Sequence, residues 1–151
     1  MAQVGLTSPV PAILCGKTLE VGEIVAPLVK PDIEIIHFIN SYEYAKTHIG
    51  ELIGGQVPSE PSGNDIGTHN YSQAPRVVFF GRVFDHERVV ELNKLFRGKG
   101  NAPVAWIAGD PDTKFPANPG PDYAEKAAQN VVKAFLKWKD SGANSEDIVY
   151  Y

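Results

Sequence analysis

The chain is poor in the features that mark several specialised classes of protein. Its single cysteine, Cys15, excludes an internal disulfide and suits a reducing compartment. No apolar run approaches the roughly 20 residues of a membrane-spanning helix. The first residues lack both the basic start and the apolar stretch of a secretory signal. We therefore expect a cytoplasmic protein with no membrane partner.

Positive charge is neither abundant nor clustered. The 14 lysines and arginines are scattered and the net charge is −4, so the sequence offers no electrostatic surface for nucleic acid. The four histidines show neither HxH nor HxxxH spacing, which argues against a metal site. What remains is an ordinary composition, 43% hydrophobic and 21% charged, which predicts one globular domain over residues 1–151.

Short apolar runs rich in Ile, Val and aromatic residues are the clearest structural signal. They are too short for helices and predict buried strands at Ala12–Cys15, Ile33–Ile39, Val77–Phe80 and Val104–Ala108. Their continuous apolar character predicts strands covered on both faces, as in a parallel sheet. The terminal Ile148–Tyr151 fits either a fifth strand at the sheet edge or a packed tail.

Helical patterns alternate with these strands. They cover Leu19–Val29, Ser41–Ile53, Asp85–Phe96 and Asp122–Lys139. Ser41 and Asp85 are suited to be N-caps. Strands alternating with helices predict right-handed βαβ crossovers. We therefore predict an α/β fold of three layers with an open, mostly parallel sheet of four or five strands, either Rossmann-like or flavodoxin-like.

Two connections are longer than such a fold needs. Gly54–Pro75 follows a helix, so it begins at the amino end of the sheet, and the sequence leaves open whether it is a functional cover, a disordered loop or a missed element. Gly109–Pro121 leaves the carboxyl end of a strand, where ligands bind in α/β sheets. Its prolines favour a semi-rigid rim.

The turn after the first strand bears on what the fold could bind. Gly16, Leu19 and Gly22 have the spacing of the GxxGxxG turn and so resemble short-chain dehydrogenases and their NAD(P)-binding relatives. Leu19 would place a branched side chain where bare backbone should approach the pyrophosphate. The second strand ends at Asn40 instead of the acidic residue that holds a ribose. We therefore predict no dinucleotide cofactor, and no Walker phosphate loop because Pro11 occupies its first glycine position.

Isolated matches to catalytic patterns have structural interpretations that we favour. Tyr42 and Lys46 have the spacing of the dehydrogenase Tyr/Lys pair but follow the second strand, on the wrong crossover. Cys15 lies near a predicted helix N-terminus and could be a nucleophile, yet free cysteines are among the most buried residues. We expect His37 to be a hydrogen-bonded core residue and His48 a surface residue.

A resemblance to a known group is carried by four segments, CGKTLEVG, EIIHFINS, VVFFGRVFD and NPGPDY. Over most of its length the chain is similar to small fungal Rossmann-like proteins, which are NAD(P)-binding by fold and associated with secondary metabolism. The resemblance implies the α/β fold and metabolite chemistry. Together with the altered turn, it implies a pocket reassigned to another small molecule.

The predicted fold brings polar loop residues to one crevice. In a strand order such as 2-1-3-4, the carboxyl ends of strands one and three flank the ligand-binding crevice. Acids, bases and cations beside apolar walls can perform acid–base catalysis or orient a ligand, although loop charges are commonly only solvated. The candidate catalytic residues are Lys17, Arg82 and His86. The candidate substrate-binding residues are Cys15, Gly16, Thr18, Asn40, Asp85 and Asp110, with Asp112 nearby.

The leading hypothesis is a cofactor-independent enzyme of secondary metabolism, an isomerase or cyclase such as a pericyclase, that acts on a small apolar metabolite. Orientation and polarisation by one or two donors would supply the catalysis. The first alternative is an oxidoreductase that uses NAD(P)H, with NADP as its cofactor, or a flavin, in an altered geometry. The second is a non-catalytic small-molecule-binding or interaction domain. A homodimer through the last helix or the IVYY tail is left open.

Overall fold

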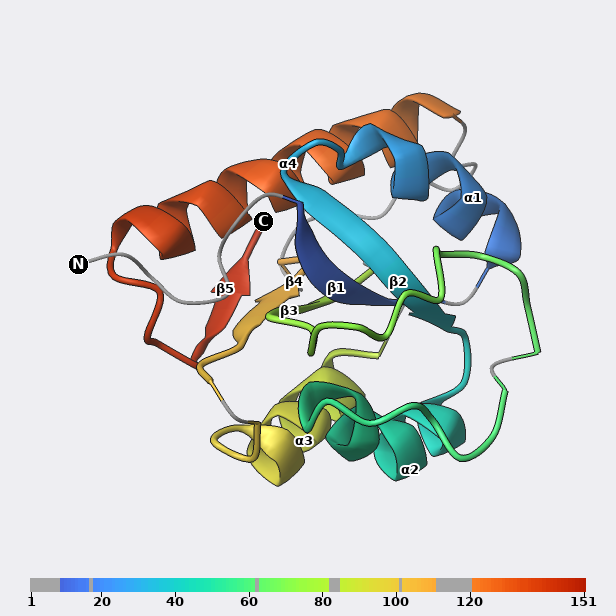
Figure 1. Cartoon of the computed structure of the whole chain (residues 1–151). Coiled ribbons are helices and arrows are strands. Elements are labelled where there is room, and N and C mark those ends of the chain that lie inside the picture. The colour runs from blue at the N-terminus through green and yellow to red at the C-terminus, as the bar shows by residue number, and fades with distance from the viewer. Residues whose placement is uncertain (1–8, 17, 62, 82–84, 101, 111–120) are drawn as a thin grey trace.

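A sheet of five parallel strands, in the order β2-β1-β3-β4-β5, forms the centre of the molecule (Figure 1). The computed structural model describes residues 9–16, 18–61, 63–81, 85–100, 102–110 and 121–151. The strands are β1 (Val10–Cys15), β2 (Ile33–Ile39), β3 (Val77–Phe80), β4 (Ala105–Ala108) and β5 (Ile148–Tyr150). All four predicted strands are confirmed, and the terminal residues form the fifth strand.

Helices cover both faces of the sheet and give the predicted three-layer α/β architecture (Figure 1). On one face lie α1 (Leu19–Leu28) and α4 (Pro121–Asp140), and on the other lie α2 (Tyr42–Ile53) and α3 (His86–Phe96). Ser41 and Asp85 cap α2 and α3 as predicted, because their side chains accept hydrogen bonds from backbone N–H groups of the first turn. In the described ranges, no helix has the length and apolarity to cross a membrane.

The last crossover departs from the expected hand. The connections through α1, α2 and α3 share one hand. The α1 connection runs along the sheet in the opposite direction to the other two, but α1 also lies on the opposite face, so the hand is unchanged. From β4 to β5 the chain moves in the same direction as from β3 to β4, but α4 lies on the opposite face from α3. This crossover therefore has the opposite hand, and the prediction of right-handed crossovers is wrong for it. The rule holds for about 98% of such crossovers, and this one is an exception.

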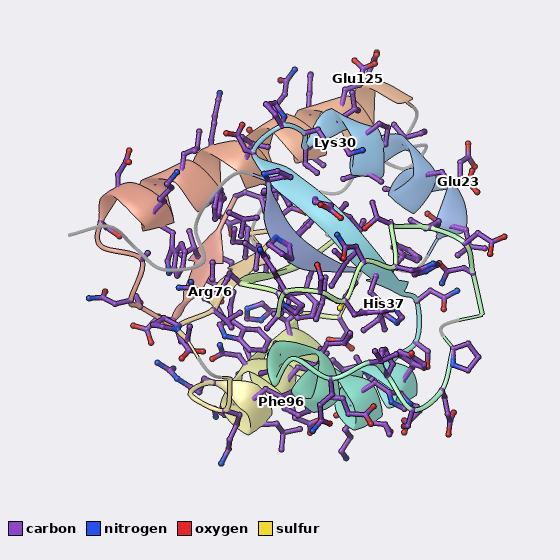
Figure 2. All side chains as sticks on the ribbon, viewed as in Figure 1. Glu23, Lys30, His37, Arg76, Phe96 and Glu125 are labelled. Carbon is purple, nitrogen blue, oxygen red and sulfur yellow. The ribbon has the colours of Figure 1, made fainter. Side chains whose placement is uncertain are left out.

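A bulge in β2 changes which face its residues occupy. Ala12 of β1 pairs with Ile35, but the next residue, Ile13, pairs with His37, so Ile36 is an extra residue in β2. Before the bulge, Ile35 packs in the core beneath α1 and α4, where uninterrupted alternation would also place His37. After it, His37 points to the α2 side of the sheet (Figure 2). The bulge thus turns a histidine of the edge strand out of the apolar core.

The third glycine of the turn after β1 has a packing role. A Cβ atom on Gly22 would stand 2.7 Å from the ring of Phe38, which is closer than real side-chain contacts allow. Gly22 therefore lets α1 lie directly on β2, which is the part that the third glycine has in the dinucleotide-binding turn. This packing supports the Rossmann-like architecture, but it is not evidence that a dinucleotide binds.

Residues 54–75 cover the free edge of β2, and their described part contains no helix or strand. The segment passes along α2 and then returns beside β2 in the opposite direction, so that Asn64 bonds the Phe38 carbonyl and Thr68 the Ile35 carbonyl. Ile66 is buried in the core on the α1 side. The segment is thus a fixed cover over an otherwise unpaired strand edge.

Candidate functional site

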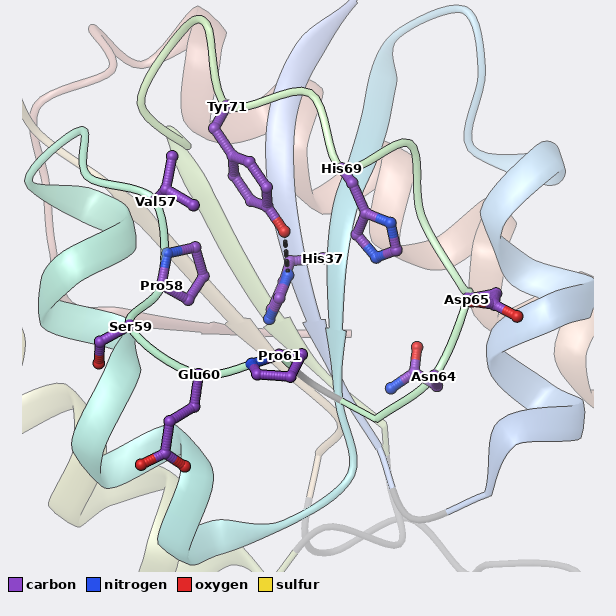
Figure 3. A pocket seen from close by; sticks show the side chains of 10 residues that line it. All are labelled: His37, Val57, Pro58, Ser59, Glu60, Pro61, Asn64, Asp65, His69 and Tyr71. Carbon is purple, nitrogen blue, oxygen red and sulfur yellow. Dashed lines mark hydrogen bonds between the residues drawn. The ribbon is translucent and has the colours of Figure 1, made fainter.

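A pocket of about 460 Å³ lies between β2 and the covering segment (Figure 3). Residues 57–61 form the side near α2, residues 64–71 form the side near β2, and His37 stands between them. Val57, Pro58 and Pro61 contribute apolar surface, while His37, His69 and Tyr71 contribute polar aromatic rings. Such a mixture, apolar walls with a few convergent polar groups, is typical of small-molecule sites.

The hydrogen bonds of His37 fix where its proton lies. The Tyr44 hydroxyl is 2.6 Å from the backbone carbonyl of Glu60, which can only accept, so Tyr44 must donate its single proton there. The same hydroxyl lies 3.0 Å from His37 Nε2 and must therefore accept from it. Nε2 thus carries the hydrogen, and Nδ1 accepts from the Tyr71 hydroxyl 2.8 Å away. A one-way chain of hydrogen bonds runs from Tyr71 through His37 and Tyr44 to Glu60.

The surroundings keep His37 neutral. Burial, followed by the charges of His69 and His48, lowers the pKa of His37 from 6.5 to about 4. Burial also raises the pKa of Tyr44 to about 12 and raises the pKa of Tyr71. At neutral pH the chain of hydrogen bonds beside the pocket therefore consists of an uncharged imidazole between two uncharged phenols. Such a group can accept or return a proton without a resident charge.

Helix α2 holds the near side of the pocket in place. The Glu51 carboxylate bonds His48 Nδ1 at 2.5 Å and the backbone N–H of Ser59 at 3.2 Å. The hydrogen bond from His48 is the largest cause that lowers the pKa of Glu51. His48 is 2% exposed and its ring lies 4.2 Å from the Tyr44 ring, so the expectation of a surface role is wrong. Glu51 thereby fixes the loop that carries the Glu60 carbonyl, which is the last acceptor in the chain of hydrogen bonds.

Gly67 fixes the far side of the pocket against the bulge. Its φ is +93°, and a Cβ atom there would lie 2.8 Å from the carbonyl carbon of Ile36. Only glycine permits this approach and this conformation. The next residues then bond the strand, with the backbone N–H of His69 donating to the Ile36 carbonyl at 2.9 Å. Two residues later the ring of Tyr71 reaches His37.

The crevice predicted at the carboxyl end of the sheet is described only in part. Lys17, Arg82 and Asp112 lie outside the described residues, as does most of the predicted rim 109–121. Asp85 caps α3, and His86 Nε2 is 2.8 Å from the Tyr150 hydroxyl of β5. The N–H of Asp110 bonds the Tyr151 carbonyl. Gly16 is buried beside Gly81, whereas Thr18 and Asn40 are exposed.

The structure bears on two catalytic alternatives from the sequence, Cys15 and the pair Tyr42 and Lys46. Cys15 is fully buried, and burial raises the pKa of its thiol far above the ordinary value, which disfavours a nucleophilic thiolate. Tyr42 packs its ring under the guanidinium of Arg88 at 4.6 Å. Among the described residues no group of three potential metal ligands comes together.

The start of α1 and the end of β2 lack two features of the usual dinucleotide site. Leu19 is the first residue of the helix and is 40% exposed, at the end where a pyrophosphate would approach bare backbone. Asn40, which follows β2, supplies no carboxylate for a ribose. We therefore assign no step to such a cofactor.

The sequence indicated only part of this pocket. The prediction that His37 is hydrogen-bonded is confirmed, but the sequence does not single out Tyr44, His69 and Tyr71 as site residues. The one available signal was a polar ring in an apolar strand together with His69 and Tyr71 at the end of an unusually long loop.

Comparison with known proteins gives one informative match. No family model matches the chain, and no solved structure matches it. The chain is similar to "Kojic acid related protein 6" of Aspergillus oryzae, with 25% identity over 144 residues, which cover 94% of this chain and 86% of that protein. The match extends over nearly all of both chains and supports the resemblance to fungal proteins.

Proposed function

We propose that this protein is an enzyme of secondary metabolism, an isomerase or cyclase that uses general acid–base catalysis in the pocket beside β2. Kojic acid is a fungal secondary metabolite, so the name of the related protein supports the metabolic setting. The observation that carries the chemistry is the chain of hydrogen bonds from Tyr71 through His37 to the Glu60 carbonyl. Because polar rings line the pocket, we propose a substrate with oxygen substituents instead of the apolar metabolite that the sequence suggested.

The chain suggests how a proton would move. A substrate O–H donates to Tyr71 Oη while Tyr71 passes its own proton to His37 Nδ1, and the oxygen left on the substrate drives the shift of a double bond or the closure of a ring. The same path in reverse returns the proton to another substrate atom. Because every proton removed is returned, the product is an isomer and no oxidant or reductant is consumed. Because the pKa of His37 is about 4, protonating it costs free energy, so the imidazolium would be short-lived and would return its proton quickly.

The reaction class can be tested without knowing the substrate. The pure protein would be incubated in D2O with a metabolite extract of the organism that encodes it, and the mixture followed by liquid chromatography and mass spectrometry. We expect one compound to be replaced by an isomer that has gained solvent deuterium. His37→Gln and Tyr71→Phe should each slow this conversion by roughly 10²–10⁴-fold, whereas His86→Asn should not. Conversion that is unchanged in both pocket variants would refute the proposal.

The oxidoreductase alternative draws on one observation, the packing of Gly22 on Phe38, which retains part of the dinucleotide-binding turn. In the same assay it predicts a product two mass units heavier or lighter that forms only when NADPH, NADH or a flavin is added. Affinity for NADPH that rises in Leu19→Gly would favour this alternative. A non-catalytic binding domain predicts retention of one metabolite with no conversion.

A further inference from the structure

We infer that the pocket beside β2 selects uncharged, planar, hydroxylated rings, phenols or stable enols, and rejects the same rings when they carry a carboxylate or phosphate. The inference rests on the proposed function for the location of the site and adds the class of ligand. Three features of the described residues carry it: the direction of the hydrogen bonds, the charges around the pocket, and the kind of surface that lines it.

The direction of the hydrogen bonds sets what Tyr71 can offer a ligand. Its one proton is donated to His37 Nδ1, because Nε2 holds the ring hydrogen and donates it to Tyr44. Toward the pocket, Tyr71 Oη therefore presents only lone pairs. A ligand that bonds it must bring a donor, such as the O–H of a phenol or enol, and a methyl ether of the same shape cannot.

The charges around the pocket disfavour an anion. Neither lysine nor arginine occurs among the described lining residues, and His37 is neutral. Glu60 and Asp65 stand on opposite sides of the pocket, with their carboxylates directed away from the central rings (Figure 3). An anionic ligand would thus lose water with no lysine or arginine to pair with, since His69 is the one described lining residue that could offer it a positive charge, and the two carboxylates would repel it.

The lining suits a flat ring. Figure 3 shows the Tyr71 ring between Pro58 on one side and His69 on the other. The rings of His69 and Tyr71 are inclined by only 25°, with centroids 6.3 Å apart. Ring faces and proline surfaces bury planar apolar area well, while the edge of the ligand remains available for hydrogen bonding. A neutral aromatic or enolic ring satisfies both requirements.

The test uses three probes that differ by one group: 4-hydroxyacetophenone, 4-methoxyacetophenone and 4-hydroxybenzoate. Dissociation constants would be measured by NMR titration on the full chain, with the ¹⁵N shifts of His37 reporting where each probe binds. We expect the phenol to perturb His37, and both the methyl ether and Tyr71→Phe to weaken binding about fivefold, as for one lost hydrogen bond. Tyr42→Phe, which changes a tyrosine outside the pocket, is the matched control and should have no effect.

For charge, 4-hydroxybenzoate should bind at least tenfold more weakly than 4-hydroxyacetophenone. The double variant Glu60→Gln, Asp65→Asn removes two exposed carboxylates, of which that of Glu60 lies 4.0 Å from His48 Nε2, and it should narrow that gap. Equal or tighter binding of the carboxylate or of the methyl ether in the wild-type protein would overturn the inference. Selective binding without any conversion in the extract would instead refute the proposed function and leave the ligand class standing.

Discussion

Two histidine–tyrosine pairs in this molecule have the same hydrogen-bond length and different surroundings. His37 and Tyr71, beside β2, are 2.8 Å apart, and so are His86 and Tyr150 at the carboxyl end of the sheet. His37 is 1% exposed and its other ring nitrogen is bonded to Tyr44, whereas Tyr150 is 43% exposed. Burial and the charges of His69 and His48 lower the pKa of His37, and its bond to Tyr44 fixes its tautomer, so distance alone does not define such a pair.

The pair beside β2 depends on backbone geometry that a single methyl group should destroy. Gly67→Ala combines a φ of +93° with a Cβ only 2.8 Å from the Ile36 backbone, and we expect it to cost about 3 kcal/mol of unfolding free energy and to abolish probe binding. Gly63→Ala is the matched control, because Gly63 has a φ of +82° but open space around it. That variant should cost about 1 kcal/mol in the same urea titration. Equal costs would mean that the approach to the bulge is unimportant.

The buried pair should also leave a signature in the pH dependence of stability. Because the pKa of His37 falls from 6.5 to about 4 on folding, the unfolded chain binds this proton more readily between those pH values. The contribution of His37 to the free energy of unfolding should therefore be complete above pH 6.5 and be lost on acidification to pH 4. We expect a loss of roughly 2 kcal/mol, which is less than the full shift would give because solvent in the pocket screens part of it.

His37→Gln should lack this component in urea titrations repeated across the range, and His86→Gln should retain it. Both variants keep His48 and His69, which face His37, so the difference between their pH profiles reports the titration of the His37 ring. The same acid-induced loss in wild type and His37→Gln would show that other groups cause it.

The smallest effect is expected at the carboxyl end of the sheet. His86→Asn removes a hydrogen bond to an exposed tyrosine, so it should change the unfolding free energy by no more than about 0.5 kcal/mol. It should also leave conversion of the metabolite intact. If His86→Asn lost as much conversion as His37→Gln, the active site would have to be assigned to the crevice predicted from the sequence.

Much of the fold was predictable because it depends on local patterns. The apolar runs of β2 and β3 gave their bounds to the residue, and Ser41 and Asp85 cap helices as their side chains suggest. The pocket was less predictable. His37 and Tyr71 are 34 positions apart, and the cover segment that joins them has no periodic pattern.

The sequence by itself determined the elements, their order and the parallel α/β layering, since these follow from the period and continuity of apolar residues. The tertiary structure decided three things that no local pattern encodes: the hand of the β4-α4-β5 crossover, the bulge at Ile36, and the approach of Gly67 to that bulge. The bulge depends on pairing with a neighbouring strand, and one extra residue is enough to turn His37 from the apolar core toward Tyr44 and Tyr71.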